Sequence, residues 1–120
     1  MFIMANEPLK DISPSEFAAY FADKCTPSDL AEAYALSSNK FWWVEDNEYD
    51  FDVGTPEHSA ARTVTDTWHH LMDHYKEQIF AILHSEGVAI PSTGQIAVLI
   101  PFMRKYGYED RAGWWFKEPR

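Results

Sequence analysis

Residues 55–87, TPEHSAARTVTDTWHHLMDHYKEQIFAILHSEG, carry the pattern of one long amphipathic helix. Thr55 precedes Pro56 and Glu57, which is the order of an N-cap, a proline at the first helical position and an acid in the first turn. Gly87 is a typical left-handed stop. Between these limits apolar residues recur at intervals of three and four, the period of a helix with one face against a core: Ala61, Val64, Trp68, Leu71, Met72, Tyr75, Ile79, Ile82 and Leu83. We therefore expect a helix over about residues 56–86, long enough to cross the whole domain or to extend into a partner.

Two further helix starts precede this segment. Residues 13–16 (Ser-Pro-Ser-Glu) form a capping box with proline at the first helical position, and residues 26–29 (Thr-Pro-Ser-Asp) repeat the signal. The first helix should end near residues 24–25. The second should run through Leu36 and then either continue to about Asp46 or break at residues 37–39 (Ser-Ser-Asn), which are weak helix formers.

Residues 88–106 fit two structures. In the first, residues 92–95 (Ser-Thr-Gly-Gln) open a helix that Pro101 kinks. In the second, residues 96–100 form a buried strand, because they are few, apolar and bounded by glycine and proline. The sequence favours the helix. For the aromatic tail, residues 108–120, we expect a loop or a short hairpin whose rings fold back onto the helices.

Length and composition indicate one domain over residues 1–120, and the short loops and repeated proline-led helix starts predict a mainly α-helical fold, a small bundle around the long helix. With 120 residues and 46% hydrophobic residues, the chain can bury a core without covalent crosslinks. Residues 1–12 show no sustained period and are expected to form a loose lead-in. Cys25 is the single cysteine, which excludes an internal disulfide framework and a multi-cysteine metal site. No segment has the length of a membrane span or the pattern of a signal peptide, so we expect a cytoplasmic protein with no membrane partner.

The charge of the chain is negative and uneven. The formal net charge is −9, which argues against direct binding to nucleic acid because phosphate affinity depends on Lys and Arg. Residues 104–120 hold five basic and three acidic residues, a balance of +2, so residues 1–103 carry −11. Residues 41–57 contain six acids and no base. Such a cluster attracts basic partners.

Paired aromatic residues suggest an interaction surface. Trp42 and Trp43 are adjacent, as are Trp114 and Trp115, and neighbours in a helix or strand cannot face the same direction. Phe80 lies off the apolar stripe of the long helix. A large aromatic core would explain most of these rings; exposed rings beside acids would instead mark a partner-binding patch. The candidate surface comprises Glu45, Asp46, Glu48, Asp50, Asp52, Trp42, Trp43, Phe80, Trp114 and Trp115.

Histidines on the long helix suggest a second hypothesis. His70 and His74 follow Asp66 at intervals of four, and Glu77 comes three residues later, so all four lie on one stripe. Two histidines at this spacing can bind one divalent metal ion. However, the stripe lies opposite the apolar face, where a helix normally meets water.

The acids between Asp46 and Glu57 also fit the oxygen spacing of a calcium-binding loop. Phe51 stands where such a loop needs glycine, so we regard the match as a coincidence within an acid-rich segment.

The sequence therefore favours a small acidic interaction module over an enzyme. Cys25, beside Lys24 and a helix start, is a weak basis for a nucleophile, and no phosphate loop, dinucleotide fingerprint or nucleophile elbow is present. The alternative is a metal-binding protein or metal-dependent enzyme that uses His70 and His74. A homo-oligomer formed through the long helix and Phe80 is the third hypothesis.

Overall fold

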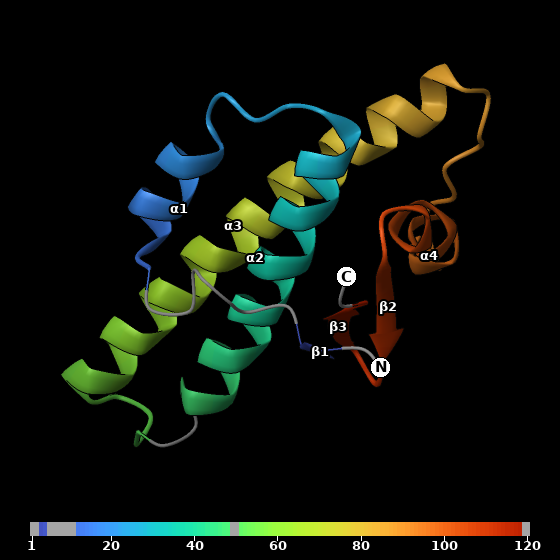
Figure 1. Ribbon diagram of the computed structural model, residues 1–120. Coiled ribbons are helices and arrows are strands. Elements are labelled where there is room, and N and C mark those ends of the chain that lie inside the picture. The colour runs from blue at the N-terminus through green and yellow to red at the C-terminus, as the bar shows by residue number, and fades with distance from the viewer. Residues whose placement is uncertain (1–2, 5–11, 49–50, 119–120) are drawn as a thin grey trace.

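The computed structural model describes residues 3–4, 12–48 and 51–118, and the protein is mainly α-helical as predicted (Figure 1). The helices of the described chain are α1 (Pro14–Phe21), α2 (Pro27–Glu48), α3 (Pro56–Ser85) and α4 (Ile96–Lys105). Its strands are β1 (Ile3–Met4), β2 (Tyr108–Arg111) and β3 (Trp114–Lys117).

Helix α3 confirms the predicted long helix to within one residue. Thr55 caps it: its hydroxyl accepts a hydrogen bond of 3.2 Å from the backbone N–H of His58. After Ser85 the chain passes through Gly87, whose φ of 86° lies in the left-handed region that glycine adopts without strain. The helix has 30 residues and runs along the bundle to the end where the chain turns toward α4 (Figure 1).

Helix α2 packs along α3 more extensively than any other pair of elements. The break predicted at residues 37–39 is wrong, because α2 is continuous from Pro27 to Glu48 and buries all three polar residues. Ser37 satisfies its hydroxyl within the helix by donating to the carbonyl of Tyr34 at 3.1 Å. Asn39 bonds to the sheet. Because these polar groups are hydrogen-bonded, the residues can be buried within a continuous helix despite their low helix propensity.

Helix α1 begins at the predicted capping box. The Ser13 hydroxyl accepts from the N–H of Glu16 at 3.2 Å, and the Glu16 carboxylate accepts from the N–H of Ser13 at 3.3 Å. The helix packs its buried Phe17 edge-on against Trp68 of α3, with ring centroids 5.2 Å apart. This contact fixes α1 across the middle of α3.

Helix α4 confirms the helical alternative for residues 96–100. The predicted capping box at residues 92–95 is wrong. The N-cap residue is Gln95 and makes no side-chain cap bond; its amide instead donates to the carbonyl of Pro91 at 3.0 Å. Pro101 lies inside the helix and has no backbone N–H, so one helical hydrogen bond is missing. Pro101 is exposed, which places it on the solvent-facing side of the helix.

The aromatic tail forms a hairpin, one of the two structures expected for it. Strands β2 and β3 pair antiparallel around Ala112 and Gly113, both with positive φ, as a tight two-residue hairpin turn requires. Strand β1 pairs with the other edge of β3, which gives the order β1-β3-β2. Strand β1 lies within the expected lead-in, residues 1–12, and its two residues are too few to show a strand period in the sequence.

The core lies between α2, α3 and the surrounding elements. Its largest fully buried side chains include Trp68 of α3, Trp115 of β3, Phe17 of α1 and Leu99 of α4. In the part of the chain that the structure describes, no helix is long and apolar enough to cross a membrane.

Candidate functional site

The end of α2, the start of α3 and the segment between them form what we call the α2–α3 tip, comprising the described side chains of residues 41–46 and 51–57. It lies at the lower left of Figure 1, away from the sheet. Its turn is held by Thr55, whose N–H and hydroxyl both donate to the carbonyl of Asp52, at 3.2 and 2.7 Å. Gly54, with a φ of 91°, completes the turn. Residues 52–55 thus form a hydrogen-bonded turn that leads into α3.

Large apolar side chains are exposed at the tip. The exposed fractions are 42% for Trp42, 61% for Trp43, 43% for Phe51 and 87% for Val53. Monomeric proteins expose single apolar residues routinely, but several together indicate a binding surface. Val53 was not predicted, and it is the most exposed large apolar residue of the described chain. In the sequence, its exposure is indicated only by its position next to Gly54 in a short polar loop.

The periodicity of α2 explains why both tryptophans face outward. Phe41 and Val44 are three residues apart and pack against the core, so this side of the helix faces α3. The ring of Phe41 lies 5.1 Å from that of His69 and 5.0 Å from that of Trp42. Trp42 and Trp43 occupy the remaining circumference and are exposed.

An acid accompanies each of these tryptophans. Glu45 follows Trp42 by three residues and Asp46 follows Trp43 by three, a spacing that makes side chains neighbours on a helix surface. Asp46 and Asp52 are exposed and Glu45 is half-buried. Asp50 and the side chain of Glu48, also predicted for this surface, lie outside the described residues. Residues 41–57 themselves contain six acids and no Lys or Arg.

Other residues predicted for the surface lie elsewhere. Phe80 and Trp115 are 6% and 2% exposed and belong to the core, so neither contributes to an outer face. Trp114 is half-buried in β3, a strand of the sheet and not part of the tip. Phe80 is covered because α3 buries residues on more than one side, among them Ile79 and Leu83. An oligomer contact through Phe80 would require the chain to open.

The predicted metal stripe does not converge on a site. His70, His74, Asp66 and Glu77 all lie on the exposed side of α3. Asp66 pairs with Arg62 at 3.5 Å, and the Nε2 of His74 is 2.8 Å from the Nε2 of Gln78. Among the described residues, no group of three or more His, Cys, Asp or Glu side chains is placed to hold a metal ion. The metal hypothesis gains no geometric support and stays a prediction.

The calcium-loop spacing conflicts with the observed helix. Helix α2 continues through Glu48, so Asp46 and Glu48, the first and third positions of the supposed loop, lie on helical backbone. A calcium loop of this type lies between its two helices. We therefore do not assign calcium binding to this segment.

No family model matches the chain, and neither a curated protein nor a solved structure matches it. Function is therefore inferred from the residues of the chain itself.

Proposed function

We propose that the protein is a small acidic binding module whose α2–α3 tip contacts a basic surface of another protein. The observation that supports this proposal most is the exposure of Trp43, at 61%, on a helix end that also carries Asp46 three residues later. The tip combines exposed apolar area with a cluster of acidic residues.

The apolar component favours a protein partner. A tryptophan can bury roughly 150–250 Å² of surface, and tryptophans dominate the binding energy of many interfaces. Trp42, Trp43 and Val53 leave much of this area in water. A partner that covers these rings would gain the free energy of removing apolar surface from water.

The acidic component favours a basic partner. Lys and Arg side chains can pair with the carboxylates of Asp46 and Asp52 and can also lie over the face of an indole ring. The net charge of −9 opposes phosphate groups, so we place the partner among proteins and not nucleic acids. We also propose a cytoplasmic location, which the single cysteine supports.

Affinity capture with matched variants tests the proposal. Trp43→Ser removes the most exposed ring of the tip, and Ile96→Ser removes an exposed apolar side chain of α4 as the control. We expect capture of a basic protein by the native chain at low salt, a roughly tenfold or greater loss with Trp43→Ser, and none with Ile96→Ser. Capture should also weaken at high salt. Equal capture by all three proteins, or no specific capture by the native chain, would contradict the proposal.

A further inference from the structure

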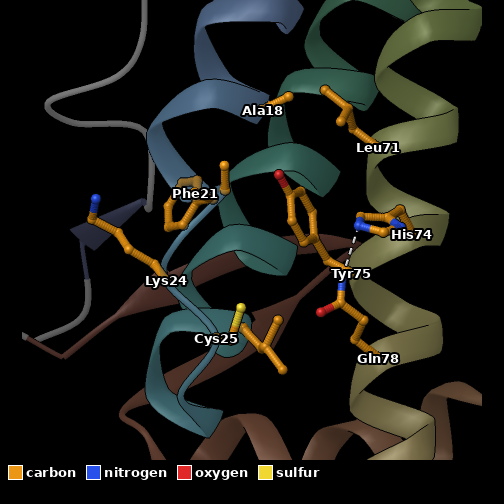
Figure 2. A pocket seen from close by; sticks show the side chains of 10 residues that line it. Ala18, Phe21, Lys24, Cys25, Leu71, His74, Tyr75 and Gln78 are labelled. Atoms are coloured by element: carbon orange, nitrogen blue, oxygen red, sulfur yellow. Dashed lines mark hydrogen bonds between the residues drawn. The ribbon is translucent and has the colours of Figure 1, made fainter.

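A pocket of about 430 Å³ lies between the end of α1, the start of α2 and the middle of α3 (Figure 2). This volume falls within the range of small-molecule sites, roughly 300–1,000 Å³. The pocket is separate from the α2–α3 tip, since none of the residues that line it belongs to the tip. A ligand here would therefore be an activity beyond the proposed function.

The walls of the pocket are mostly apolar. Phe21 of α1 and Leu30 of α2 are buried, while Ala18 of α1 and Leu71 of α3 add aliphatic surface. The ring of Phe21 lies 6.0 Å from that of Tyr75, at 64° to it. Such walls favour an apolar ligand, because a molecule that covers them removes apolar surface from water.

The basic and amide side chains of the pocket already have partners. The Lys24 ammonium donates to the carbonyl of Tyr20 at 2.7 Å, and it lies 4.1 Å from the centre of the Tyr20 ring and 3.5 Å from a carboxylate oxygen of Asp23. Figure 2 shows this ammonium pointing away from the cavity. His74 and Gln78 are hydrogen-bonded to each other at 2.8 Å. The described lining therefore favours a neutral ligand over an ion.

The Tyr75 hydroxyl is a polar group of the pocket that lacks a partner. Tyr75 is only 5% exposed, yet its hydroxyl makes no hydrogen bond with any residue that the structure describes. Figure 2 shows the Tyr75 ring among the side chains that line the cavity, with the hydroxyl directed toward Ala18 and Leu71. A buried hydroxyl without a partner costs free energy, and a ligand that accepts its proton in a hydrogen bond would remove this cost.

Burial also keeps this hydroxyl in the form that donates. It raises the pKa of Tyr75 above the ordinary 10.0, so the group holds its proton throughout the neutral range. The complementary ligand atom is therefore an acceptor, and a carbonyl oxygen is a good acceptor that carries no charge.

We infer that this pocket binds a small neutral molecule with an apolar body and a carbonyl oxygen. The body lies against Phe21, Leu30 and Leu71, and the carbonyl accepts a hydrogen bond from the Tyr75 hydroxyl. Ligand pockets commonly have this composition, with apolar walls for affinity and a few polar groups that fix the orientation.

A matched pair of ligands tests the inference. Acetophenone has a carbonyl group beside a phenyl ring, and isopropenylbenzene has the same shape with a CH₂ group in place of the oxygen. Each is titrated into the intact protein while the methyl signals are followed by NMR. Acetophenone should shift the signals of Ala18, Leu30 and Leu71 saturably at millimolar concentration. The methyl groups of Val53 and Ile96, which are exposed outside the pocket, should not respond.

Tyr75→Phe assigns the hydrogen bond, because it removes the hydroxyl and keeps the ring. The affinity for acetophenone should fall roughly two- to tenfold, as expected for the loss of one hydrogen bond, whereas that for isopropenylbenzene should stay the same or rise. Tyr34→Phe is the control, since it removes the hydroxyl of a buried tyrosine that does not line the pocket and should change neither affinity.

The stability of Tyr75→Phe tests the missing partner separately. A hydroxyl that makes no hydrogen bond does not hold the fold together, so the variant should unfold at the same urea concentration as the native protein or at a higher one. A clearly lower midpoint would mean that the hydroxyl already has a partner, and this would overturn the inference.

Three binding results would also overturn it. They are the absence of a saturable shift with acetophenone, shifts at Val53 and Ile96 as large as those in the pocket, and an unchanged ratio of the two affinities in Tyr75→Phe. Helical circular dichroism establishes that each variant is folded.

Discussion

Asn39 of α2 and Trp115 of β3 are joined by two hydrogen bonds of opposite direction. The side-chain amide of Asn39 donates to the carbonyl of Trp115 at 2.9 Å, and the N–H of Trp115 donates to the side-chain oxygen of Asn39 at 2.9 Å. Among the described residues, β1 pairs with β3 at Ile3 opposite Lys117 and at Met4 opposite Phe116. The Asn39 side chain therefore pairs with both backbone groups of Trp115, the next residue of β3, as an adjacent strand would.

Replacing Asn39 with alanine should destabilise the fold by about 3 kcal/mol, because it leaves two buried backbone groups without these partners. Gln95→Ala is the matched control: it removes an amide that makes one hydrogen bond in an exposed setting and should cost about 0.5–1 kcal/mol. Urea unfolding followed by circular dichroism measures both. An equal decrease in the free energy of unfolding in the two variants would show that the Asn39 hydrogen bonds stabilise the fold no more than the exposed Gln95 bond does.

Stability should fall at alkaline pH because of Tyr34. Burial, followed by the charges of Asp110 and Asp73, raises the pKa of Tyr34 from its ordinary 10.0 to about 12. The folded state thus holds this proton more tightly than the unfolded state. The contribution is complete below pH 10 and is lost as the pH rises through 12, at about 1.4 kcal/mol per pH unit.

Tyr34→Phe tests this pH dependence because it removes the titrating hydroxyl and keeps the ring that packs 5.8 Å from Trp115. The free energy of unfolding of the variant should decline less steeply between pH 10 and 12 than that of the native protein. Parallel declines would mean that Tyr34 is not the group responsible.

The acidic surroundings of Trp43 predict charge-selective fluorescence quenching. Caesium ions should quench the exposed tryptophans more strongly than iodide, because the carboxylates of Glu45 and Asp46 attract cations and repel anions. The difference should shrink as salt is added. In a Trp42→Phe, Trp43→Phe double variant the caesium effect should become much smaller, since Trp68 and Trp115 are buried and Trp114 is half-buried. Stronger quenching by iodide in the native protein would contradict the assignment of negative charge to this surface.

The histidine stripe should not form a specific metal site. His74 is engaged with Gln78 and His70 has no arranged third ligand among the described residues, so we expect His74→Ala to leave zinc affinity unchanged. Calorimetric titration of both proteins checks this. A tight zinc site that disappears in His74→Ala would revive the metal hypothesis.

The sequence predicted those features that depend on neighbouring residues. The boundaries of α3 and the start of α1 follow from caps and periodicity, which act within a turn or two. The exposure of Trp42 and Trp43 also has a local origin, since Phe41 and Val44 take the inward positions of the same helix.

Features that depend on distant residues were not predictable in this way. Helix α2 continues through Ser37–Asn39 because Asn39 finds a partner 76 residues away. Phe80 is buried because of the elements that surround α3, which its place on a helical wheel does not reveal.

The central position of β3 has a consequence for the order of events during synthesis. The helices α1, α2 and α3 are translated first, and their caps and mutual contacts can form early. Strand β1 and the amide of Asn39 must wait for residues 114–117, which emerge after every helix. Until then the nascent chain lacks the β3 partner of the Asn39 side chain and of strand β1. Completion of the sheet is therefore a late, long-range step of folding.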